Sequence, residues 1–480
     1  MTSAQRLLII GVAALAIPGI TEAQTPFRFD QEVVVTPTRL DEPVALVPAS
    51  VTIITAENIA ASPVADIPGV LRAHAGINVI DITGTRRSYR IDLRGFGETA
   101  SLNTLVLVDG RRANQPDFSG IDWSQIPLDR VERIEITRGA RGNVLYGDNA
   151  TGGVINIVTA RPTSYFEGYA RATYGNYDAV TLEGAVGGPI AGDALAFRVA
   201  GKYESRDGFG ENLVTGNPVD DRDAYAFRGS LQANLTPDLE VLVVADHFRE
   251  DDYNYGFHYF GPTVVPEAAL PGPLLGGDTI NDYYADLGRP VDNRNLYSNE
   301  DAINDRKGTS VQGIVTFDRG DFSLTSTTAY RTFERFNRND LDVSDANAFG
   351  QNNYVEDSES FSQELTFTAD LGTISLLGGA MYFEEELFGE VRVPTINLAQ
   401  YFNIALGTNL PADLFDGGNY LQSGTVKTEA VGAYLEGAID ITPSLTFTAG
   451  ARYNWEKRSG TGRFTFDAQG IDIPTDKSGD

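Results

Sequence analysis

The chain has 480 residues, with 66 acidic against 37 basic side chains and a formal net charge of −29 at pH 7. A phosphate-binding footprint needs clustered lysine and arginine, so this balance argues against a nucleic-acid partner. The sequence holds no cysteine, which excludes disulfides, iron–sulfur clusters and a cysteine nucleophile, and its three scattered histidines do not favour a histidine-rich metal site.

The N-terminus predicts an export signal over residues 1–23. Arg6 gives a positive start, residues 7–17 form an uncharged apolar run, and Thr21 and Ala23 supply small side chains before a cleavage site. This order is typical of a secretory signal peptide, and the run is shorter than the ~20 residues of a membrane-spanning helix. A buried N-terminal helix is the alternative. No later stretch is long enough for such a helix, so a mature protein that crosses a membrane would use strands.

Residues 24–45 form a short proline-containing segment, and residues 46–162 predict a mixed α+β domain that is dense in glycine and arginine. Short apolar runs predict strands over residues 51–55, 104–108, 131–136 and 154–158. The stretch 59–71 resembles the start of a helix that Pro63 and Pro68 interrupt, because proline removes a backbone donor and clashes with the preceding turn.

Residues 163–480 predict a long succession of antiparallel strands, because apolar and polar side chains alternate with period two. Eleven strands are expected, beginning near Glu167, Asp178, Asp193, Asp223, Asp238, Gly308, Asp321, Glu359, Gly372, Glu429 and Ser444. The alternation alone suits a soluble sandwich as well as a barrel. The polar face carries charges such as Glu240, Asp246 and Arg452, which a packed core would not tolerate unpaired but a wet lumen accepts.

The connections between these strands favour the barrel. Very short turns near residues 189–192, 236–237, 319–320, 370–371 and 442–443 alternate with long loops over 205–222, 250–307, 333–358 and 387–428. Outer-membrane barrels have this asymmetry, with short periplasmic turns and long external loops, whereas a soluble sandwich has no reason to sort its loops by length.

A series of ordered motifs lies between residues 93 and 159. They are LRGFG at 93–97, VLVDG at 106–110, VERIEITRG at 131–139, NVLYG at 143–147 and TGGVINIVT at 151–159. Together these motifs resemble the plug domain of the TonB-dependent outer-membrane receptors, with one departure at Ala140, where the family usually has proline. The resemblance implies an α+β plug domain over residues 46–162, followed by an antiparallel transmembrane β-barrel of the 22-stranded type in the bacterial outer membrane.

In the light of this resemblance, one short segment is similar to the TonB box, through which family members contact the energy-transducing protein TonB and its inner-membrane partners. The segment consists of Glu32, Val33, Val34, Val35 and Thr36. Three consecutive valines favour an extended chain that could add to the sheet edge of a partner. An ordinary edge strand of the plug is the alternative, but the position soon after the cleavage site and before Pro37 favours the box.

The resemblance also implies that arginines of the plug face glutamates of the barrel wall. Arg94 and Arg138 are the plug arginines, and Glu364 and Glu436 are their candidate partners on the lumen-facing side of the eighth and tenth strands. A buried carboxylate needs a cation, and arginine can engage it with two hydrogen bonds. Alternatively, these carboxylates only line a wet lumen.

Ligand contacts are expected from the plug loops that point outward in the resemblance, at about 81–90 and 112–122, and from the long loop 250–307. The candidate residues are Arg86, Arg87, Tyr89, Asn114, Gln115, Phe118, Tyr255 and Tyr259. Adjacent arginines beneath aromatic walls suit a planar anionic ligand, which favours an anionic ferric chelate over the less charged cobalamin. The two arginines could instead merely offset Asp81 and Asp92.

The length of the strand-rich region predicts that the barrel is incomplete. Eleven strands over residues 163–480 are about half of the ~22 strands of a plugged transporter, and the polar C-terminus lacks the terminal aromatic residue that family barrels commonly carry. We therefore expect an N-terminal fragment with a complete plug and roughly half a barrel, because a half barrel would leave unpaired strand edges in the outer-membrane lipid.

The leading functional hypothesis is active, TonB-dependent import of a scarce ligand, with an iron–siderophore complex as the commonest cargo that the resemblance implies. Cobalamin, haem or carbohydrate are the alternatives within the family. A passive pore has no use for a plug, and a signalling transducer would need a further domain before the TonB box. No catalytic, metal or cofactor constellation supports an enzyme.

Overall fold

The computed structural model describes residues 50–64, 66–81, 89–114, 131–139, 149–253, 294–340, 351–396, 418–442 and 445–468, the short pieces 33–34, 42–43, 145–147, 471–472 and 475–479, and positions 121, 123, 126, 345, 409 and 411. The signal-peptide prediction over residues 1–23 lies outside these residues. No described helix is both long and apolar enough to cross a membrane.

One large antiparallel sheet dominates the described residues, and we call its eleven long strands the wall. Each strand pairs with the next long strand along the chain, so the wall is a simple meander. Its strands are β10 (Glu167–Tyr174), β11 (Val180–Ala191), β12 (Leu195–Arg206), β15 (Arg222–Thr236), β16 (Leu239–Asp252), β17 (Ile303–Asp318), β18 (Phe322–Asp340), β19 (Gln351–Asp370), β20 (Ile374–Ile396), β21 (Gly418–Thr442) and β22 (Leu445–Ala468). The last strand also pairs with β23 (Ile471–Asp472) and β24 (Thr475–Gly479).

The two faces of the wall differ in polarity, as the period-two alternation predicts. On the inner face, Ser310 and Gln312 are buried, while Val311 between them is 46% exposed on the outer face. Leu365 and Leu435 are likewise 46% and 53% exposed on that outer face. A sheet with polar residues buried inside and apolar residues exposed outside is inverted relative to a soluble protein and suits a lipid-facing surface.

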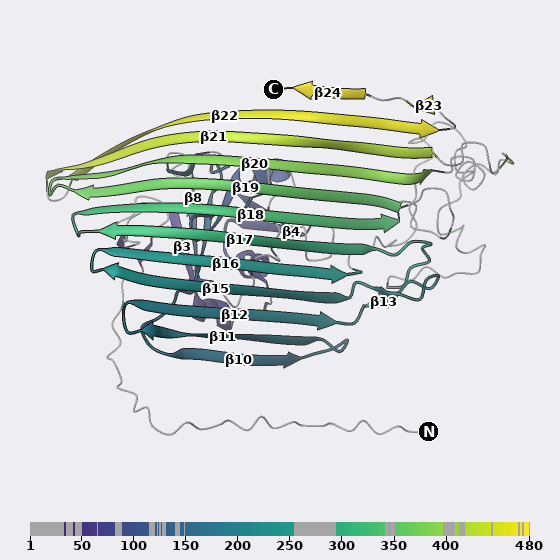
Figure 1. Cartoon of the computed structure of the whole chain (residues 1–480), viewed down its shortest axis with the longest axis horizontal. Coiled ribbons are helices and arrows are strands. Elements are labelled where there is room, and N and C mark those ends of the chain that lie inside the picture. The colour runs from purple at the N-terminus through teal and green to yellow at the C-terminus, as the bar shows by residue number, and fades with distance from the viewer. Residues whose placement is uncertain are drawn as a thin grey trace, which may run out of the picture.

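The connections sort by length, as predicted from the sequence. Figure 1 shows short turns, such as those after β11 and β17, at one end of the wall, and the long connection over residues 207–221 at the other. This connection carries the small hairpin of β13 (Gly210–Glu211) and β14 (Pro218–Val219).

The bounds of several loops were wrong. Strand β19 begins at Gln351 rather than near 359, β21 begins at Gly418 rather than near 429, and β18 and β20 extend to Asp340 and Ile396. The first residues of β19, from Gln351 to Asn353, are polar on both faces, and at the start of β21 the apolar Tyr420 and Leu421 are adjacent, so neither start shows an alternation of apolar and polar side chains.

The plug contains a mixed five-stranded sheet in the order β3-β8-β9-β6-β7, in which β6 and β9 are parallel. Its strands are β3 (Ser50–Thr55), β6 (Thr104–Val108), β7 (Arg111–Arg112), β8 (Val131–Arg138) and β9 (Gly153–Thr159). The predicted strands are therefore present. A separate hairpin of β4 (Ile77–Asp81) and β5 (Tyr89–Leu93), and the 3-10 helix η2 (Gly97–Leu102), have no counterpart in the prediction.

Two short helices replace the single interrupted helix that was expected over 59–71. Helix α1 (Ala56–Ala61) starts with a capping box between Thr55 and Asn58 and ends before Pro63. Helix α2 (Ile67–Arg72) starts at Asp66, whose side chain accepts a hydrogen bond from the Gly69 amide at 2.7 Å. Pro68 lies in the first turn of this helix, where backbone N–H groups have no partner within the helix, so the missing donor of proline breaks no hydrogen bond.

The plug sheet encloses the main apolar core, whose fully buried members include Ile54, Leu71, Leu93, Ile134, Ile155 and Ile157. In Figure 1, the plug elements β3, β4 and β8 lie against one face of the wall, between its two ends. Upstream of the plug, β1 (Val33–Val34) pairs with β2 (Glu42–Pro43).

Candidate functional site

The interface between plug and wall centres on a tight turn between β6 and β7. Val108 pairs with Arg111, so the turn contains only Asp109 and Gly110, and both adopt positive φ, at 49° and 81°. Two positive φ angles in a two-residue hairpin define a type I′ turn, for which Asp-Gly is a preferred sequence.

Asp109 forms an ion pair with the wall. Its carboxylate lies 2.5 Å from the guanidinium of Arg228 on β15, and it also accepts hydrogen bonds from the amide and hydroxyl of Thr159, at 2.8 and 2.7 Å. Arg228 in turn binds both oxygens of Asp246 on β16, each at 3.0 Å. Gln312 on β17 donates to the Asp109 carbonyl at 3.0 Å. We call this group the clasp.

The clasp is well shielded from water. Arg228 is 8% exposed, and its side chain meets an Asp109 side chain that is 12% exposed. Ion pairs in such surroundings are screened little by solvent, and the loss of one partner leaves a costly unpaired charge. The clasp therefore ties the plug directly to β15 and β17, and Arg228 links β15 to Asp246 on β16.

On the other wall strands, arginines bind neutral acceptors of the plug. Arg331 on β18 donates to the carbonyl of Ala113 at 3.3 Å, and Arg452 on β22 donates to the carbonyl of Leu145 at 3.0 Å. Leu145 also packs with Leu377 and Tyr434 of the wall. The neighbouring Gly147 has φ 76°, and a Cβ there would lie 2.8 Å from the Arg452 guanidinium.

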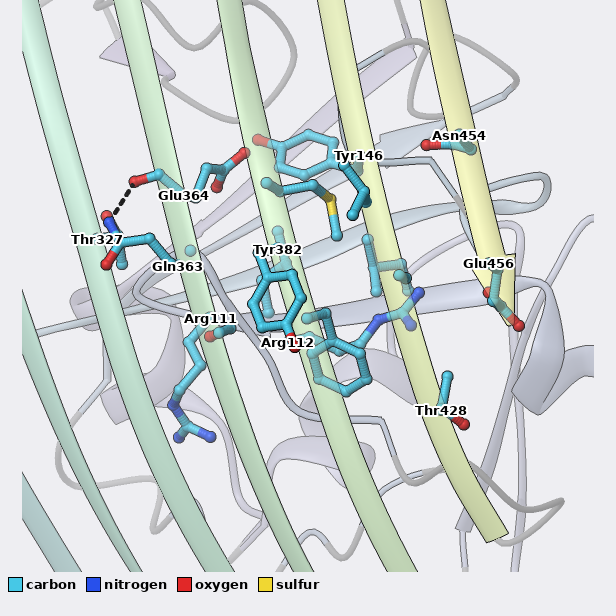
Figure 2. Close-up of a pocket in the computed structure, with 18 of the residues that line it drawn as sticks. Arg111, Arg112, Tyr146, Thr327, Gln363, Glu364, Tyr382, Thr428, Asn454 and Glu456 are labelled. Carbon is cyan, nitrogen blue, oxygen red and sulfur yellow. Dashed lines mark hydrogen bonds between the residues drawn. The ribbon is translucent and has the colours of Figure 1, made fainter. Parts of the chain in front are cut away.

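A cavity separates the plug from strands β18 to β22. Figure 2 shows Arg111 and Arg112 reaching it from the plug, and Glu364, Thr428 and Glu456 coming from the wall strands. The guanidinium of Arg112 lies 5.8 Å from the centre of the Phe383 ring, within the range of a cation–π contact. The remaining lining residues are Leu105, Leu107, Gly110, Tyr146, Thr327, Ser362, Gln363, Met381, Tyr382, Phe383, Ala430, Val431, Arg452, Asn454 and Trp455.

Arg111 has an unusual electrostatic environment. Burial and the neighbouring guanidinium groups of Arg331 and Arg228 together lower the pKa of its guanidinium to about 10, although Asp246 and Asp109 oppose the shift. The group remains charged at neutral pH, because this pKa still lies well above 7.

The clasp differs from the predicted lock in its polarity, since the wall supplies the arginine and the plug supplies the carboxylate. The pairing expected of Arg138 is corrected by the structure: its guanidinium donates to Thr52 at 2.7 Å and to the Ala75 carbonyl at 2.9 Å, both in the plug. Arg138 ends β8, opposite the start of β3, so these groups are its nearest acceptors. Glu364 and Glu436 are half-buried on the inner face, and a pairing of either with Arg94 stays a prediction.

Family models match both parts of this architecture. Residues 43–154 match the TonB-dependent receptor plug domain, and residues 246–479 match the TonB-dependent receptor-like β-barrel. The chain belongs to the TonB-dependent receptor family.

The chain is similar in sequence to two vitamin B12 transporters. It is 34% identical over 271 residues to the vitamin B12 transporter BtuB of Photobacterium profundum, and 35% identical over 221 residues to the BtuB of Vibrio cholerae. These alignments cover 55% and 46% of this chain, and 42% and 35% of the two transporters. The chain thus spans less than half of the length of these relatives.

Solved structures with the same fold include siderophore receptors. The ferric yersiniabactin uptake receptor FyuA of Yersinia pestis superimposes with a TM-score of 0.66 at 18% identity, over 90% of this chain and 60% of FyuA. The ferripyoverdine receptor of the outer membrane of Pseudomonas aeruginosa gives 0.64 at 17% identity, over 92% of this chain and 55% of that receptor. At such identities the likeness concerns the fold alone.

Two of the predicted ligand residues are structural in this receptor. Asn114 is 5% exposed; its side chain accepts from the Val106 amide at 2.7 Å and donates to the carbonyls of Ser101 and Thr104. Tyr89 is 6% exposed, and its hydroxyl donates to Asp66. Both side chains therefore stabilise the plug instead of presenting a surface to a ligand. The other candidates, Arg86, Arg87, Gln115, Phe118, Tyr255 and Tyr259, lie outside the described residues.

The predicted TonB-box segment is described only at its centre. Val33 and Val34 form β1, and they pair with Pro43 and Glu42 respectively. The extended backbone expected for this segment is thus present at these two residues. Glu32, Val35 and Thr36 lie outside the described residues.

The sequence analysis did not predict the clasp residues as a functional site. Asp109 and Gly110 belong to one of the plug motifs, and an Asp-Gly pair between strands is a turn signal. The alternation of side chains along β15 places Arg228 on the inner face of the wall, and this direction could have been predicted from the sequence. The contact itself joins residues 119 positions apart, and no local pattern connects them.

Proposed function

We propose that this receptor binds a scarce ligand outside the bacterial outer membrane and imports it with energy supplied by TonB. The observation that carries this proposal is a plug held against the polar face of a strand wall whose other face is apolar. A plug in this position blocks free passage, so import needs a force that moves it. That requirement favours active uptake over a passive pore.

The proposed contact with TonB is the segment Glu32–Thr36. The extended backbone of Val33 and Val34 supports it, because strand addition uses main-chain hydrogen bonds and needs an extended partner. The ladder with Glu42 and Pro43 is only two residues long, so a longer strand of a partner could compete with it.

For the cargo, we favour an anionic ferric siderophore. Arg111 and Arg112 at the plug–wall boundary support an anionic ligand, since guanidinium groups bind carboxylates and related anions with charge-assisted hydrogen bonds. Cobalamin is the second candidate, and the vitamin B12 transporters that are 34% and 35% identical to this chain support it.

Uptake by cells that produce the receptor tests both cargoes. Radiolabelled ferric siderophores and radiolabelled cobalamin are supplied separately, with and without functional TonB, and surface binding is measured apart from internal accumulation. We expect ferric siderophore to accumulate only with TonB. Accumulation of cobalamin alone would transfer the assignment to the second candidate, and accumulation that is independent of TonB would contradict active import.

A substitution in the proposed box tests the coupling step. Val34→Pro removes a backbone donor and fixes φ, so strand addition to TonB should fail while surface binding persists. Val34→Thr is the matched control, because threonine keeps the donor and the strand propensity. Undiminished accumulation by the proline variant would remove Glu32–Thr36 from the mechanism.

A further inference from the structure

The cavity between the plug and strands β18 to β22 is bounded by a contact of the plug with the wall. On β20, Met381 and Phe383 line the cavity, and Leu377 lies on the same face, nearer the short turn that precedes the strand. Leu377 is 4% exposed and packs in one cluster with Leu145 of the plug and Tyr434 of β21. This contact therefore bounds the cavity on the side of the short turns.

Arg452 fastens the contact from β22. Its guanidinium donates to the carbonyl of Leu145 at 3.0 Å and lies over the ring of Tyr434, 5.4 Å from the ring centre. Its Nε donates to the side chain of Asn454 at 2.7 Å, which orients the group. One side chain thus binds the plug backbone and makes a cation–π contact with the apolar cluster beside it.

Two glycines make room for this guanidinium, one in the plug and one in the wall. A Cβ at Gly147 would lie 2.8 Å from the guanidinium of Arg452, and a Cβ at Gly432 of β21 would lie 2.5 Å from it. Both distances are shorter than any ordinary contact of a Cβ, so a side chain at either position would displace the arginine. The seat of Arg452 is therefore specific to these residues.

Tyr146 connects this contact to the rest of the plug. Its side chain lines the cavity (Figure 2) and packs both with Leu107 of β6 and with the cluster of Leu145. A shift of β6 would reach the contact through these packed side chains, and the cavity beside Tyr146 provides space for a movement that a close-packed interior would resist.

We propose that the plug segment 145–147 is a gate at the short-turn end of the cavity, and that Arg452 is its latch. Short turns face the periplasm in outer-membrane barrels, so the closed gate separates the cavity from the periplasmic side. The role of the gate rests on the proposed transport function: it opens when TonB moves the plug, and cargo then passes between Leu145 and strands β20 to β22.

A cysteine reporter tests the latch on the isolated chain, which has no native cysteine. In the detergent-solubilised Leu377→Cys chain, a maleimide should label the thiol slowly, and the rate should follow the population of the open gate. Arg452→Gln in this background should raise the rate roughly tenfold or more, because the Leu145 carbonyl loses a hydrogen bond from a charged donor.

Arg458→Gln is the matched control for the latch. Arg458 lies on the same face of β22, but it is half exposed and binds Glu456 of its own strand. The labelling rate of Leu377→Cys should therefore not change. An Arg452→Gln variant that is labelled no faster than Arg458→Gln would show that Arg452 is not a latch.

A second reporter shows whether the opening is local. Ser310 is 7% exposed and lines a crevice between the plug and β15 to β18, beside the clasp, and Ser310→Cys only replaces an oxygen by sulfur. Arg452→Gln should leave the labelling of this cysteine unchanged, because the clasp still holds the plug there. Equal acceleration at both reporters would show that the whole plug leaves the wall, which would overturn the gate.

A reversible cross-link tests the passage of cargo in cells. Leu145→Cys combined with Leu377→Cys, once oxidised to a disulfide, should abolish the accumulation of ferric siderophore and of cobalamin but leave surface binding intact. A reductant should restore accumulation, and each single variant serves as a control. Accumulation through the oxidised receptor would show that cargo takes another route.

The two experiments separate the gate from the transport proposal. A native receptor that accumulates neither cargo would count against the proposed transport function. The labelling rates of the isolated chain would still decide whether segment 145–147 opens locally and whether Arg452 holds it closed.

Discussion

The plug of this receptor is held differently on its two sides. Toward β15–β17, the clasp joins oppositely charged groups that are shielded from water, Asp109 and Asp246 with Arg228. Toward β18–β22, the wall arginines bind plug carbonyls, and a cavity separates plug from wall. Anchoring is therefore asymmetric: one side holds a shielded ion pair, and on the other side arginines donate to backbone carbonyls beside a cavity.

The largest expected effect comes from breaking the clasp. Arg228→Ala removes the shielded cation that binds Asp109 and the partly buried Asp246, which should lower the free energy of plug unfolding by about 3–5 kcal/mol. The two tryptophans provide the measurement, since Trp123 is buried in the plug core and Trp455 lies on β22. In a Trp455→Phe background, fluorescence during a urea titration reports on the plug.

A double-mutant cycle sharpens this first prediction. Asp109→Asn and Arg228→Ala should interact, so that the double variant loses less stability than the sum of the two single losses. Strict additivity would show that the two side chains do not stabilise each other across the interface.

A smaller effect is expected on the opposite side. Arg452→Ala removes a charged donor from the Leu145 carbonyl, and the half-buried site allows water to replace it, so the loss should be ~1 kcal/mol. The same fluorescence titration applies. A loss as large as that of Arg228→Ala would contradict the asymmetry.

The smallest effect concerns pH at the start of β15, the strand that carries Arg228. Burial, with a smaller contribution from Asp252, raises the pKa of Asp221 to about 6, although the amide of Tyr253 opposes the shift. Between its ordinary value of 3.8 and about 6, the folded chain binds a proton that the unfolded chain does not, so stability falls as pH rises through this range.

Asp221→Asn should remove this dependence. Asparagine keeps an oxygen that can accept from Tyr253, so the variant should be slightly more stable than the native chain at neutral pH and should converge with it near the acid end of that range. Thermal unfolding at a series of pH values is the measurement. A native chain whose stability instead rises with pH across the same range would show that Asp221 does not titrate as described.

The fold was predictable where turns are marked and one face is apolar. All eleven wall strands were expected, and those beginning at Leu239, Phe322 and Leu445 start within a residue of the predicted position because proline, glycine or aspartate marks the boundary. Strand β19 was placed too late, since its first residues, Gln351 to Asn353, are polar on both faces. The apolar–polar alternation that predicts strands is absent from those residues.

The site was much less predictable, and Arg138 shows why. The family resemblance implied that Arg138 pairs with a glutamate of the wall. Its actual partners depend on how β8 lies beside β3, which the resemblance does not specify. Asn114 is similar: a polar residue near an outward loop suggests a ligand contact, yet three backbone groups of the plug satisfy its amide. Only packing decides between these outcomes.

The order of strands in the plug sheet has a mechanical consequence. The chain from β1 enters the sheet at Ser50 on β3, an edge strand with β8 as its only neighbour in that sheet, whereas Asp109 follows β6 near the opposite edge. A tension applied upstream of Ser50 must cross β8 before it reaches β9, whose last residue, Thr159, belongs to the clasp. Detaching β3 alone would release about 20 Å of tether, at roughly 3.4 Å for each of its 6 residues, while the far edge stays anchored.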